Sequence, residues 1–91
     1  MDQPTLEELR NEIDSINKKI ILLLARRMSV TQQIAALKKR EQKPIHDMKR
    51  EEEILRSVSD DAKVHGLDEA FVRRIFSEIM EHTKVRESEV R

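Results

Sequence analysis

The sequence lacks cysteine, tryptophan and tyrosine, and its 91 residues include one glycine and two prolines. Without cysteine, no disulfide can brace a core that is marginal at this length, which favours association of chains. Phe71 and Phe76 are the only aromatic residues. Strands need aromatic and β-branched clusters with turn residues between them, and these are missing. The composition therefore predicts an all-α fold in a single domain, residues 1–91.

Charge of one sign is also missing, because 18 basic residues are balanced by 18 acidic residues. A balanced chain is a poor candidate for binding nucleic acid, which draws on a net positive surface. The basic run Lys38-Lys39-Arg40 with Lys43 has no interleaved aromatic residue, so we interpret it mainly as a solvated helix end. The sequence predicts no nucleic-acid partner.

Segments that would direct the chain to a membrane or hold a cofactor are not evident. Met1 to Arg10 is polar and acidic, unlike a signal peptide, and the longest fully apolar run, Ile20 to Ala25, is too short to span a bilayer. We therefore expect a cytoplasmic protein without a membrane partner. The three histidines have no ligand-like spacing, and no glycine-rich phosphate loop or nucleophile–histidine motif is present. We expect no metal and no cofactor.

The most prominent feature that is present is one helical stretch from Leu6 to about Arg40. Its apolar residues recur at alternating steps of three and four, which predicts a helix packed along its whole length against other helices. They are Leu6, Leu9, Ile13, Ile16, Ile20, Leu23, Val30, Ile34 and Leu37, named here the α1 seam. Such a helix is about 50 Å long, whereas a compact chain of this size is only about 30 Å across. We therefore expect a homodimer in which long helices from two chains intertwine.

Capping residues define the limits of three helices. Thr5 and Glu8 form a capping box before the first helix, and Pro44 requires that helix to end near Arg40 to Gln42. Asp47 can cap a second helix of roughly Met48 to His65, after which Gly66 suits a left-handed position. Asp68 can cap a third helix, whose tail from Glu87 to Arg91 we expect to be frayed.

The two shorter helices also have apolar faces that polar residues interrupt. The predicted inner face of the second helix is Met48, Glu51, Leu55, Val58 and Ala62. The predicted face of the third helix is Phe71, Val72, Ile75, Phe76, Ile79 and Met80, and whole turns extend it to Thr83 and Glu87. Polar residues on these positions, together with those of the long helix, are candidates for a site.

Arg27 occupies the position in the α1 seam where the next apolar residue is due, between Leu23 and Val30. A guanidinium among apolar side chains is destabilising unless an anion meets it. Lys38 lies three turns later on the same face, about 16 Å along the axis. With the inward polar residues of the other helices, the two cations predict a pocket for a small, multiply charged anion. The alternative is a structural ion-pair network in which Arg27 meets Glu51 or Glu87.

Arg10 shares the heptad phase of Lys38 but lies about 25 Å from Arg27 along the helix. The two therefore cannot grip one small ligand within a chain. In an antiparallel dimer of long helices, Arg10 of one chain approaches the middle of the other, although a solvated arginine is the simpler interpretation from the pattern alone.

The sequence resembles the all-helical class of chorismate mutases nearly from end to end. The match is carried by four segments: Leu9-Arg10-Asn11-Glu12-Ile13-Asp14, Leu24-Ala25-Arg26-Arg27 with Lys38, Pro44-Ile45-His46-Asp47-Met48-Lys49-Arg50-Glu51, and the late helix with Phe76, Ile79, Met80 and Thr83. Members of this class are intertwined helical dimers that rearrange chorismate to prephenate. The resemblance therefore implies chorismate as the substrate and an isomerase that needs no cofactor.

The resemblance also implies a role for each polar residue. Arg10 of the partner chain and Arg27 would bind the two carboxylates, and Arg50 would strengthen the positive field. Lys38 would donate to the ether oxygen, and Thr83 would help to position a carboxylate. Glu51, with the backbone at Asp47, would hold the ring hydroxyl.

Glu87 departs from the pattern, because well-known bacterial members have a glutamine opposite the lysine. An ionised carboxylate cannot donate a hydrogen bond to the ether oxygen, so Glu87 would have to be protonated in that role. Alternatively, Glu87 lies on a frayed end and faces water. Two other functions stay open from the sequence: an isochorismate-pyruvate lyase on the same fold, and a non-catalytic helical dimerisation module whose inner charges fix the register. The 91 residues leave no room for a fused dehydratase or dehydrogenase, so we expect a stand-alone domain.

Overall fold

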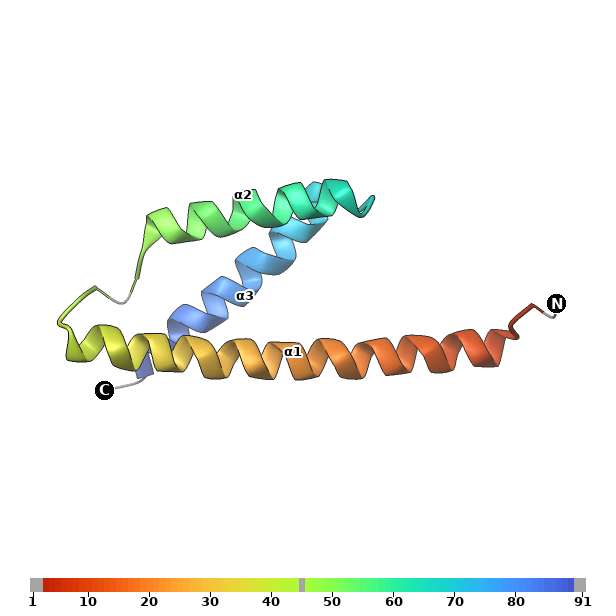
Figure 1. Ribbon diagram of the computed structural model, residues 1–91, viewed down its shortest axis with the longest axis horizontal. Helices are drawn as coiled ribbons and strands as arrows, with labels where there is room; N and C mark the ends of the chain where they lie inside the picture. Colours follow the sequence, from red (N-terminus) through yellow and green to blue (C-terminus); the bar gives the residue numbers. More distant parts are fainter. Residues whose placement is uncertain (1–2, 45, 90–91) are drawn as a thin grey trace. The chain divides into compact units, whose positions relative to one another are not determined.

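The computed structural model describes residues 3–44 and 46–89, and in these ranges the only regular elements are three α-helices. They are α1 (Leu6–Arg40), α2 (Met48–Val64) and α3 (Glu69–Glu89) (Figure 1). The all-α prediction is confirmed. Met1 and Asp2, Ile45 of the predicted motif, and Val90 and Arg91 of the predicted tail lie outside the described residues.

The chain divides into two compact units, Met1–Val30 and Thr31–Arg91. In the first unit α1 begins where the sequence predicts, because the Glu8 amide donates a hydrogen bond to Thr5 Oγ1 at 3.1 Å. No residue of 3–26 is buried, and the side chains of the α1 seam are between 42% and 63% exposed. By length and composition alone, α1 could cross a membrane, but core helices of soluble proteins also satisfy this criterion.

In the second unit α1 ends at Arg40 in a left-handed turn. Gln42 has a φ of 57°, and the Lys43 amide donates to the Lys38 carbonyl at 2.8 Å. This bond closes a Schellman motif, which satisfies carbonyls that the last turn of a helix otherwise leaves unpaired.

The helices α2 and α3 form a packed pair joined by the short turn at Gly66 (Figure 1). Asp47 caps α2, with its Oδ1 accepting from the Arg50 amide at 3.0 Å, and Asp68 caps α3, with its Oδ1 accepting from the Phe71 amide at 2.8 Å. Gly66 has a φ of 69°, as the left-handed position predicts. The helix α2 ends at Val64, so His65 is its C-cap and not its last residue.

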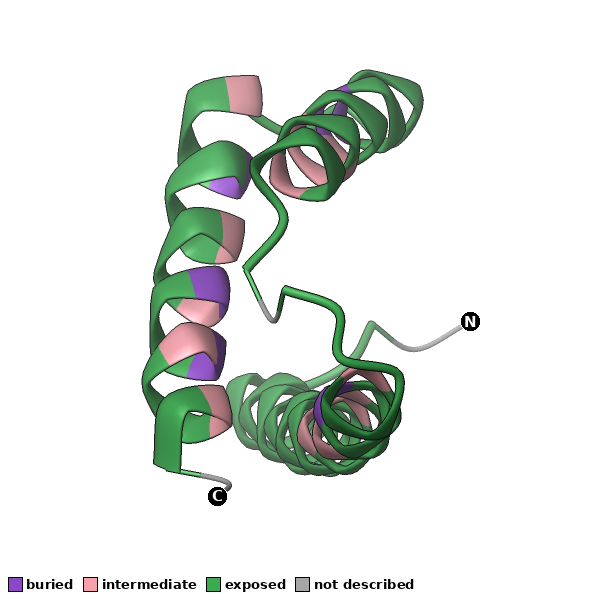
Figure 2. Cartoon of the chain, turned by 90° about the vertical axis from the view of Figure 1, so that its left-hand side faces the viewer, coloured by how far each residue is buried: buried purple, intermediate pink, exposed green. Residues whose placement is uncertain are grey.

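Only part of each predicted inner face is buried. Ser59 and Ala62 of α2 and Val72, Met80 and Thr83 of α3 are buried, and on α3 the buried and half-buried residues follow one side of the ribbon (Figure 2). Met48, Phe71 and Ile75, which the sequence also predicts to face inward, are not buried in the single chain, because they are 69%, 50% and 41% exposed. Phe71 and Ile75 each precede an inward residue by one position, which rotates them by about 100° around α3.

The predicted fraying from Glu87 is also wrong as far as the described residues extend. The last turn of α3 is helical to Glu89, and Glu87 is half-buried. Side chains stabilise this turn: Ser88 Oγ donates to the Lys84 carbonyl at 2.9 Å, and Arg86 pairs with Glu89 at 3.2 Å. Within the described residues, Glu87 thus lies on an ordered, half-buried turn and not on a solvated end.

Candidate active site

The polar residues that the sequence predicts on inward positions are sheltered to different degrees in the second unit. Thr83 is buried, and Lys38, Glu51 and Glu87 are half-buried. Charged side chains are normally exposed, so the half-buried Lys38, Glu51 and Glu87 are candidates for a binding or catalytic site. Lys38 is in α1, Glu51 in α2, and Thr83 and Glu87 in α3.

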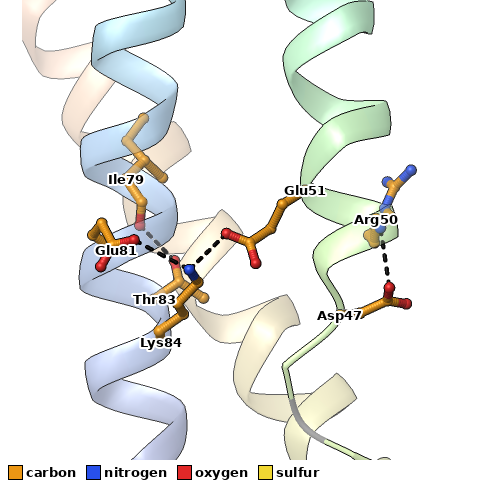
Figure 3. Close-up of polar contacts among 7 residues, drawn as sticks. All are labelled: Asp47, Arg50, Glu51, Ile79, Glu81, Thr83 and Lys84. Atoms are coloured by element: carbon orange, nitrogen blue, oxygen red, sulfur yellow. Dashed lines mark hydrogen bonds and ion pairs between the residues drawn. The ribbon is translucent and has the colours of Figure 1, made fainter.

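Glu51 of α2 and Lys84 of α3 form a sheltered ion pair. Lys84 Nζ lies 2.8 Å from Glu51 Oε1, and the two side chains are 29% and 21% exposed. Figure 3 shows Glu51 reaching from α2 toward α3, where Lys84 meets it beside Thr83. The same ammonium also contacts Glu81 Oε1 at 3.1 Å, on the exposed side. Lys84 therefore connects α3 to α2 through Glu51.

The second carboxylate oxygen of Glu51, unlike the first, accepts no hydrogen bond from Lys84. Glu51 Oε2 is buried and has no hydrogen-bond partner among the described residues. A buried acceptor without a donor is destabilising by roughly 1–3 kcal/mol, so native structures nearly always provide one. The carboxylate thus offers one oxygen that can accept a hydrogen bond from a ligand.

The hydrogen bond that Lys84 donates to Glu51, and then the one that it donates to Glu81, raise the pKa of the Lys84 ammonium above its ordinary value of 10.5. Each carboxylate also attracts the charged form directly, whereas partial burial opposes it. Lys84 is therefore fully charged at neutral pH, and it holds a positive charge next to Glu51.

Thr83 donates its hydroxyl hydrogen to the Ile79 carbonyl at 2.8 Å, one turn back along α3 (Figure 3). This bond is a common arrangement for a threonine within a helix. In this rotamer the hydroxyl hydrogen is directed to Ile79, so it cannot at the same time be donated to a carboxylate.

Asp47 and Arg50 lie at the start of α2 and are exposed. The Asp47 carboxylate is occupied by capping the helix. The Arg50 guanidinium is 65% exposed, contacts Glu53 at 3.4 Å and points away from Glu51 (Figure 3). The structure therefore brings Glu51 and Thr83 to the space between α2 and α3 but directs Arg50 to solvent.

Arg10 and Arg27 belong to the first unit. Arg10 is exposed, whereas Arg27 is half-buried. The next residue back, Arg26, is exposed, as its position off the seam predicts. The difference between these adjacent arginines agrees with the pattern, which puts Arg27 alone on the inward side of α1.

Lys84 is the residue that sequence reasoning missed. The predicted face of α3 continues from Met80 to Thr83 and Glu87 and does not include Lys84. A signal was nevertheless present, because Lys84 follows Val72, Phe76 and Met80 at steps of four residues. Residues four apart lie on one face of a helix, so the row leads directly to Lys84.

Comparisons with known proteins identify the family of this chain. A family model described as chorismate mutase type II matches residues 9–88. A chorismate mutase of Methanocaldococcus jannaschii is 37% identical over 79 residues, which cover 87% of this chain and 80% of that protein. A bifunctional chorismate mutase/prephenate dehydratase of Enterobacter agglomerans is 34% identical over 80 residues, which cover 88% of this chain and 20% of that protein.

The corresponding bifunctional protein of Escherichia coli (strain K12) is 30% identical over 73 residues, which cover 80% of this chain and 19% of that protein. The chain thus spans about a fifth of the length of these bifunctional relatives. The family match extends over nearly all of the chain, and most of the archaeal enzyme aligns with it. The resemblance inferred from the sequence motifs is confirmed: this chain belongs to the chorismate mutase type II family.

Proposed function

We propose that this protein is a chorismate mutase, which rearranges chorismate to prephenate in a pocket lined by all three helices. The observation that carries the proposal is the set of sheltered polar residues Lys38, Glu51, Thr83 and Glu87, together with the membership of the chain in the family. The reaction is a unimolecular pericyclic rearrangement, so it requires neither a nucleophile nor a group transferred from a cofactor. The enzyme has to select the compact reactive conformer and stabilise the charge that develops as the C–O bond lengthens.

Cationic residues perform both tasks in this proposal. Arg27, with Arg10 donated in trans by the second chain, binds the two carboxylates and so holds the substrate in its folded conformer, which removes much of the entropic barrier. Lys38 donates to the ether oxygen, where negative charge develops, and this preorganised donor stabilises the transition state more than the ground state. Glu87 in its protonated form donates to the same oxygen.

The remaining residues fix the ring. Glu51 accepts a hydrogen bond from the ring hydroxyl, and the buried, unpartnered Oε2 supports this role because it lacks a donor. The backbone at Asp47 assists. Thr83 and Arg50 need other side-chain rotamers to act on the substrate: the Thr83 hydroxyl has to turn from Ile79 toward a carboxylate, and Arg50 has to leave Glu53 to strengthen the positive field.

The proposal includes a homodimer. The α1 seam is between 42% and 63% exposed in the single chain, and the only buried apolar residues among those described are Ala35, Ala62, Val72 and Met80. A core this small is marginal, and an apolar stripe of this length is unfavourable in water. Packing α1 against the α1 of a second copy covers the stripe and supplies Arg10 in trans. Sedimentation at several concentrations tests this, and a monomer at micromolar concentration would contradict it.

We expect the enzyme to act in the cytoplasm, with α1 covered by protein and not by lipid. Arg27 supports this choice, because a guanidinium within the apolar stripe is costly in the hydrocarbon core of a bilayer. Recovery of the protein only from the membrane fraction would contradict it.

The test of function is direct. Purified protein is mixed with chorismate, and the loss of its ultraviolet absorbance is followed while prephenate is measured. We expect rapid loss with one prephenate formed per chorismate. Unchanged chorismate would refute the mutase and leave the isochorismate-pyruvate lyase and the dimerisation module as the interpretations.

A further inference from the structure

In the ion pair of Lys84 and Glu51, the two oxygens of the carboxylate have different surroundings. Of the two Glu51 carboxylate oxygens, Oε1 lies 2.8 Å from Lys84 Nζ, and Oε2 is buried without a hydrogen-bond partner among residues 3–44 and 46–89. A carboxylate on a flexible glutamate side chain can rotate and exchange its oxygens. Anchoring Oε1 on a lysine suppresses that rotation and leaves Oε2 in one direction.

Lys84 is itself held in place. Its ammonium contacts Glu51 on the sheltered side and Glu81 Oε1, at 3.1 Å, on the exposed side. Glu81 is 67% exposed, so it can fix the lysine without competing for the interior of the site. Because Glu51 and Glu81 both accept from the Lys84 ammonium, the lysine is fixed in position. The position of the Glu51 carboxylate is therefore determined by α3 as well as by the rotamer preference of its own side chain.

We propose that Lys84 is a positioning residue that aligns Glu51 Oε2 with the ring hydroxyl of the substrate, and thereby contributes to recognition of that hydroxyl. The proposal rests on the proposed function, because Glu51 has to face the substrate. Lys84 acts through Glu51 and does not touch the reacting atoms. The site that contains Glu51 would then bind a cyclic dicarboxylate with a secondary hydroxyl on the ring.

The alternative is that the pair only ties α2 to α3. The chain offers a matched control for this, since Lys63 and Glu69 form a second ion pair between the same helices at 3.7 Å. Their side chains are 62% and 44% exposed, and Lys63 lies near the turn, at the opposite end of α2 from Glu51. A merely structural role predicts that replacing either lysine changes stability alone.

The experiment measures kcat/KM for two substrates with wild type, Lys84→Met, Lys84→Arg and Lys63→Met. One substrate is chorismate, and the other is an analogue in which hydrogen replaces the ring hydroxyl while the allyl vinyl ether and both carboxylates remain. We expect Lys84→Met to lose about 10- to 100-fold with chorismate, the usual value of a hydrogen bond to a charged group. With the analogue, wild type and Lys84→Met should differ by less than about threefold, and Lys84→Arg should retain most of the activity.

A second comparison tests the route through Glu51. If Lys84 acts by positioning this carboxylate, then Glu51→Gln combined with Lys84→Met should be no slower than Glu51→Gln alone, because coupled residues give non-additive losses. Lys84→Gln provides another neutral side chain in case methionine prevents folding. Equal losses on both substrates, multiplicative losses in the double variant, or an equal effect of Lys63→Met would overturn the role of Lys84. Wild-type protein inactive toward chorismate would instead overturn the proposed function itself.

Discussion

Gln42 and Gly66 occupy the same left-handed position at the ends of two consecutive helices, with φ values of 57° and 69°. In both turns the amide of the next residue donates back to the carbonyl five residues earlier, from Lys43 to Lys38 and from Leu67 to Ala62, each at 2.8 Å. Glycine adopts this conformation without strain, whereas a side chain destabilises it by roughly 1 kcal/mol. The fold therefore has one unstrained and one strained version of the same helix end.

The two turns give opposite predictions for stability. Gln42→Gly should raise the free energy of unfolding by about 0.5–1 kcal/mol, and Gly66→Ala should lower it by about 1 kcal/mol. No atom lies within 4 Å of a Cβ built on Gly66, so the loss reflects backbone strain and not a clash. Denaturant unfolding at one fixed protein concentration measures both changes. Equal signs for the two variants would contradict the interpretation.

The raised pKa of Lys84 predicts a pH-dependent contribution to stability. A lysine whose pKa is higher in the folded state stabilises the fold fully below its ordinary pKa of 10.5, and the contribution is lost as pH rises through the higher, folded value. Wild type should therefore be more stable than Lys84→Met at pH 7, and the difference should shrink above pH 10.5. Thermal melts of both proteins at matched concentration test this.

The control for that measurement is Lys63→Met, which removes a more exposed pair. Exposed ion pairs contribute little, so we expect a smaller change at every pH. A difference between wild type and Lys84→Met that persists undiminished at high pH would mean that the lysine stabilises through its aliphatic stem.

Replacing the two inward cations of α1 should abolish most of the activity. Arg27→Ala and Lys38→Ala are each expected to lower kcat/KM by about 10²- to 10³-fold, because each removes a preorganised donor to developing or fixed negative charge. The matched controls are their neighbours Arg26→Ala and Lys39→Ala, which are exposed and should change activity by less than about threefold. If a control variant lost as much kcat/KM as the variant of the neighbouring inward cation, the assignment of inward and outward faces to α1 would be contradicted.

The assignment of Arg10 in trans predicts complementation between inactive chains. Arg10→Ala and Arg27→Ala homodimers should both be nearly inactive. In a heterodimer, one of the two sites combines an intact Arg27 with an intact Arg10 from the other chain, so activity should return. Differently tagged chains, purified together and assayed for loss of chorismate, provide the measurement. Absence of activity in verified heterodimers would refute donation in trans.

Glu87 should make activity dependent on pH. Only a protonated carboxyl can donate to the ether oxygen, so kcat/KM should fall as pH rises and Glu87 ionises. The amide of Glu87→Gln donates at every pH, and its profile should be flat over the same range. Parallel profiles for the two proteins, measured in buffers of constant ionic strength, would eliminate this role.

Sequence reasoning succeeded wherever the determining interactions are local. The start of each helix depends on a side chain that accepts from an amide three residues later, as Thr5, Asp47 and Asp68 do. Gly66 depends on its own backbone conformation. The period of the apolar residues fixed the extent of α1, and the motif around Asp47 and Glu51 identified the family before any contact was known.

The partner of Glu51 could be decided only by tertiary structure. Lys84 lies 33 residues later in the chain, and nothing in the local sequence connects the two; they meet because α2 and α3 pack. The same packing buries Thr83 and leaves Phe71 half exposed, against the order of their hydrophobicity. A helix has one face to bury, and which residues lie on that face depends on its rotation against a neighbour. That rotation is fixed by contacts distant in sequence, so periodicity alone leaves it uncertain by one residue.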